Sequence, residues 1–129
     1  RLFDDKFSLD DVRQANISLT VEGPEGFQLE GNSSMKQISR DPLELVQHCS
    51  GNHHQYPDGL MLFLGTMFAP IQDRDEPGQG FTHKVGDTVR IHTPLLGSLV
   101  NRVNTCDQIT PWTFGTGALM RNLAQRGLL

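Results

Sequence analysis

The chain of 129 residues has few cysteines and no long apolar run. Its two cysteines, Cys49 and Cys106, are too few to staple a small secreted domain, which favours a reducing compartment. No apolar stretch approaches the ~20 residues that a membrane-spanning helix needs, and no charged-then-apolar leader opens the chain. We therefore expect a soluble, cytoplasmic protein.

Basic residues are also scarce, because eleven Lys and Arg stand against fifteen Asp and Glu and give a net charge of -4. No cluster of basic residues is interleaved with aromatics, so the electrostatic footprint of a nucleic-acid-binding protein is missing. The chain also lacks the G-x-S-x-G, H-E-x-x-H and P-loop patterns. Residue chemistry alone therefore shows no complete catalytic set, and neither nucleic acid nor a membrane is an expected partner.

The length and composition indicate one folded domain over residues 1–129. The mass of 14.4 kDa is that of about one domain, and a hydrophobic content of 36% is enough to form a core. Thirteen glycines and seven prolines disfavour a helical bundle, since each costs about 1 to 3 kcal/mol inside a helix. The expected class is therefore β-rich α+β.

Alternating apolar residues predict two hairpins. The first joins strands over 17–21 and 27–30 through the turn at 23–26, and the second joins strands over 88–92 and 98–103. The continuous apolar run over 60–64 predicts a further strand that is buried on both faces. A polar segment rich in Pro and Gly, residues 69–82, predicts a long loop.

Local capping signals predict three helices. Ser8 with Asp11 has the capping-box form and predicts a helical turn over 9–14. Asp41-Pro42, with Glu44 behind it, marks a helix start over 43–48. Helical spacing of Leu119 and Leu123, with Gly127 as the cap, predicts a C-terminal helix of about three turns.

Two clusters of candidate metal ligands occur, and each has a plain alternative. The first contains imidazole and thiolate groups, but zinc sites usually pair two distant knuckles, so we expect a loop without zinc. The second contains carboxylates that suit magnesium, but we favour a solvated loop in which Arg74 neutralises the charge. The clusters are His48, Cys49, His53 and His54, and Asp73, Asp75 and Glu76. Cys49 itself suits a buried, inert thiol.

Gly65-Thr66 follows the apolar run over 60–64. Glycine permits close backbone approach there, and backbone N–H groups with a hydroxyl suit a carboxylate or ketone oxygen. The alternative is a Gly-Thr turn that only ends a strand.

Three segments, in order, resemble the fumarylacetoacetate hydrolase superfamily. Gly31-Asn32-Ser33-Ser34-Met35 resembles its G-E-T-S-x-M segment, and Pro57-Asp58-Gly59 through Gly65-Thr66 resembles its G-D-x-[IL]-x-T-G-T-P strand. Val85-Gly86-Asp87-Thr88-Val89-Arg90-Ile91 and Leu96-Gly97-Ser98-Leu99-Val100-Asn101 resemble P-G-D-x-[IV]-x-[IV] and G-x-G-x-[LI]-x-N. The resemblance covers about residues 17–103.

This resemblance implies a mixed β-sandwich roll of the family's C-terminal type, with short helices. It implies an enzyme that holds a 2-oxo or β-diketo acid with Mg or Mn while a carbon-carbon bond is hydrolysed, the metal acting as Lewis acid on the enolate. Thr66 matches the threonine that contacts the substrate carboxylate, Gly65 lies beside it, and Ser33 and Ser34 border the pocket. The family's Glu-x-Glu pair, Asp and catalytic Lys would lie upstream of Arg1, so this chain alone is expected to bind no metal and its catalytic residues are unknown.

Departures from the family pattern point to a different substrate. Leu64 replaces the first Thr of T-G-T-P and Met67 replaces its Pro, which favours dehydration or decarboxylation of a 2-keto-3-deoxy sugar acid as an alternative. The loop over 72–82 is longer than the family's turn and is expected to close over the site. Expected partners are the missing N-terminal half and a second copy in a homodimer. The remaining alternative is a non-catalytic β assembly module.

Overall fold

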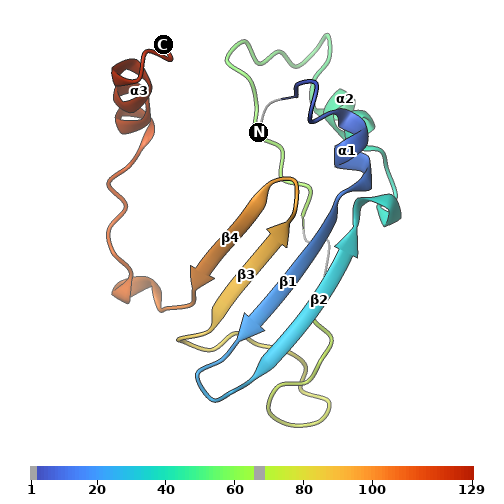
Figure 1. Cartoon of the computed structure of the whole chain (residues 1–129), viewed down its shortest axis with the longest axis vertical. Coiled ribbons are helices and arrows are strands. Elements are labelled where there is room, and N and C mark those ends of the chain that lie inside the picture. Colours follow the sequence, from blue (N-terminus) through green and yellow to red (C-terminus); the bar gives the residue numbers. More distant parts are fainter. Residues whose placement is uncertain (1–2, 66–68) are drawn as a thin grey trace.

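The computed structural model describes residues 3–65 and 69–129 and shows a small α+β domain built on one four-stranded antiparallel sheet (Figure 1). The strand order is β2-β1-β3-β4. The strands are β1 (Asn16–Glu22), β2 (Gln28–Ser34), β3 (Thr88–Thr93) and β4 (Gly97–Arg102). The helices are α1 (Leu9–Gln14), α2 (Pro42–Cys49) and α3 (Thr116–Gln125), with short 3-10 turns η1 (Met35–Gln37) and η2 (Cys106–Gln108). The predicted α+β class is confirmed.

Both predicted hairpins form. The first closes through Gly26, which has φ +81°, and the second through Gly97, which has φ +89°; both values lie in the left-handed region that glycine adopts without steric cost. β1 and β3, which are far apart in the sequence, then pair along the middle of the sheet. The two hairpins therefore lie side by side in one sheet.

The sheet has one apolar face, which we call the inner face. Val21 of β1 lies between Leu29 and Val89, and paired residues in an antiparallel sheet project to the same side. Val21 is fully buried and Leu29 is nearly so. The inner face is less buried at the edge of the sheet that β4 forms, where Leu99 is 59% exposed.

The three predicted helices are present. Ser8 and Asp11 form the full capping box at the start of α1, and Asp41 caps α2 by accepting the N–H of Leu43. Gly127, which has φ +67°, lies two residues beyond the last residue of α3 and ends the helix in the left-handed conformation. Its N–H bonds to the Ala124 carbonyl while that of Leu128 bonds to the Leu123 carbonyl, which is the Schellman arrangement.

The predicted strand over 60–64 is wrong. These residues form no strand, and Met61 and Phe63 are 81% and 86% exposed. An apolar run becomes a doubly buried strand only where layers cover both of its faces, and the described residues supply no such layers here. The polar segment over 69–82 is irregular, as predicted.

The described core is small. Its buried apolar side chains are Phe7, Val21, Leu29 and Met35. The molecule exposes 10434 Å², whereas a compact monomer of this mass exposes about 6,800 Å². Figure 1 shows α3 apart from the sheet, at the end of an extended arm. The described chain is therefore more open than a compact monomer, and many of its large apolar side chains are exposed, among them Met61, Phe63 and Leu99.

Among the described residues, none of the helices combines the length and the apolarity needed to cross a membrane. The cytoplasmic location expected from the sequence stays a prediction. The family-type roll also stays a prediction, because the described residues form a single sheet.

Candidate substrate-binding site

Ser33 and Ser34 lie at the end of β2, opposite Ile17 and Asn16 of β1. Neighbouring strand residues project to opposite faces, so Ser33 shares the inner face with Leu29 while Ser34 lies on the other face. The Ser34 hydroxyl accepts the N–H of Lys36 at 3.4 Å and caps η1. Both serines are half-buried. Ser34 thus helps the chain turn away from the sheet directly beside a cavity.

Gly65 has φ +83°, in the left-handed region that favours glycine. An added Cβ would meet no atom within 4 Å, so the backbone conformation, and not the predicted close approach, accounts for glycine here. Thr66, the residue singled out with it, lies outside the described residues.

A cavity of about 380 Å³ is lined by residues from two of the segments that resemble the family. Met35, which ends the first segment, and Leu64, which precedes Gly65, both line it. Its volume lies within the usual range for small-molecule sites. The predicted residues Ser33, Ser34 and Gly65 are chain neighbours of this lining and do not line the cavity themselves.

Both apolar and polar side chains line the cavity, as is common in small-molecule sites. Its apolar lining comes from Met35, Ile38, Leu45 and Leu64, and its polar lining from Gln37, Ser39 and Arg40. No sequence motif indicated Arg40. Its position at the cavity depends on how α2 and residues 60–65 approach η1.

Asp41, the carboxylate next to Arg40 in the chain, is engaged elsewhere. Arg13 of α1 donates to its two oxygens at 2.6 and 3.1 Å, and Leu43 donates its backbone N–H at 2.9 Å. The hydrogen bonds from Arg13 hold the pKa of the Asp41 carboxyl below its usual value. Asp41 therefore joins α1 to α2 and stays ionised.

Thr93 is a second feature that sequence analysis missed. It ends β3 on the inner face, opposite Gly97, and is 7% exposed. Within residues 3–65 and 69–129 its hydroxyl has no hydrogen-bond partner, although buried hydroxyls nearly always have one. A threonine at the end of an alternating strand gives no signal of this kind in the sequence.

The loop over 69–84 is organised around Arg74, whose side chain is 1% exposed. Arg74 donates to both oxygens of the buried Asp87 at 2.6 and 2.8 Å, to Glu25 at 3.1 Å, and to the Thr82 carbonyl at 3.2 Å. Its guanidinium also lies 4.4 Å from the centre of the Phe27 ring. The prediction that Arg74 neutralises the neighbouring carboxylates in a solvated loop is wrong, because its ion pairs are with Asp87 and Glu25 and its side chain is buried.

The expected closure of the loop over the site is wrong. Arg74 binds Glu25 in the β1–β2 turn, and Gln72 donates to the Gln28 carbonyl at the start of β2. Ser33 and Ser34 lie at the opposite end of β2, about 17 to 20 Å away along the strand. Figure 1 shows the loop beside the β1–β2 turn.

In the part of the chain that the structure describes, no group of three or more His, Cys, Asp or Glu side chains could hold a metal ion. Asp73 instead accepts the backbone N–H groups of Gly78 and Gly80 at 2.7 and 2.6 Å. These bonds lower the pKa of its carboxyl. Cys49 is half-buried, a weaker burial than we predicted, and Cys106 is exposed. That this chain alone binds no metal stays a prediction.

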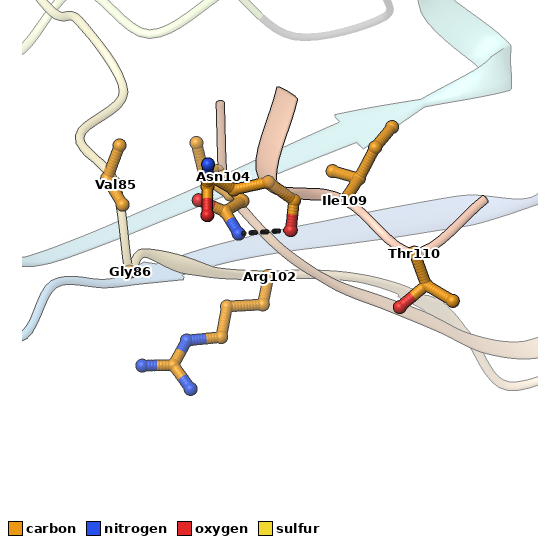
Figure 2. A pocket seen from close by; sticks show the side chains of 8 residues that line it. Val85, Gly86, Arg102, Asn104, Ile109 and Thr110 are labelled. Carbon is orange, nitrogen blue, oxygen red and sulfur yellow. Dashed lines mark hydrogen bonds between the residues drawn. The ribbon is translucent and has the colours of Figure 1, made fainter. Parts of the chain in front are cut away.

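A second cavity, of about 340 Å³, lies between the end of β4 and η2 (Figure 2). Val85, Gly86 and Arg102 contribute to its lining, but Arg102 extends away from the hydrogen bond that Asn104 donates to the Gln108 carbonyl at 3.2 Å. Its lining contains no chain neighbour of the predicted residues Ser33, Ser34 and Gly65, whereas Met35 and Leu64 in the first cavity are such neighbours. The first cavity is therefore the stronger candidate.

Comparison with known proteins gives no matching family model, no matching curated protein and no matching solved structure. The family resemblance therefore depends on the sequence segments themselves.

Proposed function

We propose that this chain is the C-terminal portion of a fumarylacetoacetate-hydrolase-like enzyme that acts on 2-oxo or β-diketo acids. The observation that carries the proposal is the cavity that Met35 and Leu64 share. These residues belong to two separate segments that resemble the family, and a common substrate site requires the segments to meet. The third segment forms β3 and β4, which extend the sheet beside β1.

The part of this chain in the reaction is to bind and orient the acid. By resemblance, Thr66 contacts the substrate carboxylate, with Gly65 beside it and Ser33 and Ser34 at the border. In hydrolysis of a β-diketo acid, water adds to the distal carbonyl carbon, the carbon-carbon bond breaks, and a proton completes the released 2-oxo acid. The described residues hold no ligand set for Mg or Mn, so we derive no step through a metal.

A second candidate within the same superfamily is dehydration or decarboxylation of a 2-keto-3-deoxy sugar acid. The apolar Leu64 at the cavity, in place of the family's threonine, favours it because the hydrogen bonding around the substrate must differ. The products separate the candidates, since hydrolysis releases two acids, elimination releases water, and decarboxylation releases carbon dioxide.

A non-catalytic assembly module is the alternative from another class. The exposed apolar side chains fit an interface in either case and therefore do not separate the two alternatives. In the enzyme, these side chains would meet the N-terminal half and a second copy in a homodimer. In the module, assembly would be its whole function.

Comparison of Thr66→Val with the wild type, in the intact protein, separates the enzyme from the module. We expect the variant to fold as the wild type does and to lose turnover of a 2-oxo acid, because valine keeps the shape and removes the hydroxyl. Folding is checked by circular dichroism, and Thr113→Val, at an exposed position on the C-terminal arm, is the matched control. Unchanged turnover in Thr66→Val would contradict the role of Thr66, and absence of turnover in the wild type would favour the module.

A further inference from the structure

Arg40 lines the cavity with its charge uncompensated. It is exposed and makes no hydrogen bond or ion pair in the described part of the chain. Asp41, the next residue in the chain, is bound to Arg13 and forms no ion pair with Arg40 among the described residues. Arg40 therefore contributes an unpaired positive charge to the polar lining of the cavity.

Two other arginines of the chain, Arg13 and Arg74, form ion pairs with carboxylates. Arg13 bridges Asp10 and Asp41, and Arg74 is enclosed by Asp87 and Glu25. Arg40 differs from both, because it borders a cavity and forms no ion pair with a carboxylate in the part of the chain that the structure describes. The apolar side chains that also line the cavity would strengthen its attraction for an anion by reducing contact with water.

We propose that Arg40 binds the carboxylate of the acid that occupies this cavity. The inference rests on the proposed function and adds a residue to it. A guanidinium supplies both a positive charge and two parallel N–H donors, which match the two oxygens of a carboxylate. The apolar lining from Met35 and Leu64 then faces the carbon chain of the acid.

The test measures the affinity of the intact protein for pyruvate and for methyl pyruvate by calorimetry. Methyl pyruvate replaces the carboxylate of pyruvate by a neutral methyl ester, and neither probe contains the β-diketone that the proposed hydrolysis cleaves. The variants are Arg40→Gln, which removes the charge, and Arg40→Lys, which keeps the charge and loses the paired donors. Arg121→Gln, on the exposed surface of α3, is the matched control.

We expect the wild type and the control to bind pyruvate about 10- to 100-fold more tightly than the ester. Arg40→Gln should reduce this preference to less than about 3-fold with unchanged affinity for the ester, and Arg40→Lys should retain part of it. A preference that survives in Arg40→Gln, or no preference in the wild type, would overturn the inference.

Turnover of a β-diketo acid is measured separately and distinguishes the two proposals. If the wild type cleaves 2,4-dioxopentanoate while Arg40→Gln keeps the preference for pyruvate, the inference fails and the proposed function stands. If the wild type prefers pyruvate and turns over no 2-oxo acid, the enzyme proposal fails and Arg40 remains the anion-binding residue of the cavity.

Discussion

Arg74 and Asp87 form a buried ion pair with two hydrogen bonds, of 2.6 and 2.8 Å, that fastens the loop over 69–84 to the turn before β3. Both side chains are at most 1% exposed. The Lys84 backbone N–H donates to Asp87 as well, at 2.9 Å. The loop is therefore fixed at one end of the sheet by charges that water does not reach.

Arg74→Met should destabilise the fold strongly, because it leaves the Asp87 carboxylate buried without its partner. Breaking a buried pair on one side costs about 3 to 5 kcal/mol. Urea unfolding of the 129-residue chain measures the change in free energy. Arg13→Met is the matched control, since Arg13 is also paired with an aspartate but is 39% exposed. Equal losses in the two variants would contradict a special role for burial.

Stability should fall as the solution is acidified below about pH 4, where an unfolded aspartate begins to protonate. The hydrogen bonds from Arg74 hold the pKa of Asp87 well below its usual value, so the folded chain resists protonation. The unfolded chain then binds more protons, and this stabilisation is lost as the pH falls toward the lower folded-state pKa.

Asp87→Asn checks this assignment through urea unfolding between pH 7 and pH 3. The variant should be less stable at pH 7, and its stability should depend less steeply on pH than that of the wild type. The pH dependence of the free energy of unfolding that remains in the variant comes from the other carboxyls whose pKa is lowered, namely Glu25, Asp41, Asp73 and Asp107. An unchanged slope would show that Asp87 does not govern the acid transition.

Thr93→Val should stabilise the fold by about 1 to 2 kcal/mol, because it removes a buried hydroxyl that has no partner and preserves the shape of the side chain. Urea unfolding measures the gain. Thr88→Val, at a half-buried position on the same strand, should give no comparable increase. A loss of stability in Thr93→Val would mean that the hydroxyl is bonded in the folded chain.

Leu99→Asp should weaken association of the intact protein, because it places a charge on the open part of the inner face. Val100→Asp is a matched control on the neighbouring residue, since Val100 is similarly exposed but lies on the opposite face of the sheet. Sedimentation velocity measures the mass of the assembly. Greater dissociation in the control would assign the interface to the other face.

Local patterns predicted the helices and both hairpins because their causes lie within a few residues. Ser8 with Asp11, and Asp41 with Pro42, specify helix starts through bonds to the next turn. Alternation over β1 and β3 likewise places the apolar side chains of each strand on one face of the sheet. The run over 60–64 failed because burial depends on the layers around it, which the run itself does not encode.

The site was predicted only in part because its contacts are long-range. Met35 and Leu64 line one cavity from segments far apart in the sequence, and neither was predicted as a site residue. Arg40 and Thr93 have no sequence signal, because the lack of a partner is a property of the folded chain. Arg74 and Glu25 are 49 positions apart, and no local periodicity connects them.

The most direct test of the central claim is the reaction of the intact protein with 2,4-dioxopentanoate in the presence of Mg²⁺, followed by proton NMR. The account predicts that acetate and pyruvate appear in equal amounts. A control sample without the protein should form neither product. A 2-keto-3-deoxy sugar acid is tested in parallel for elimination and decarboxylation. Persistence of both compounds unchanged would contradict the assignment of this chain to an enzyme of 2-oxo acids.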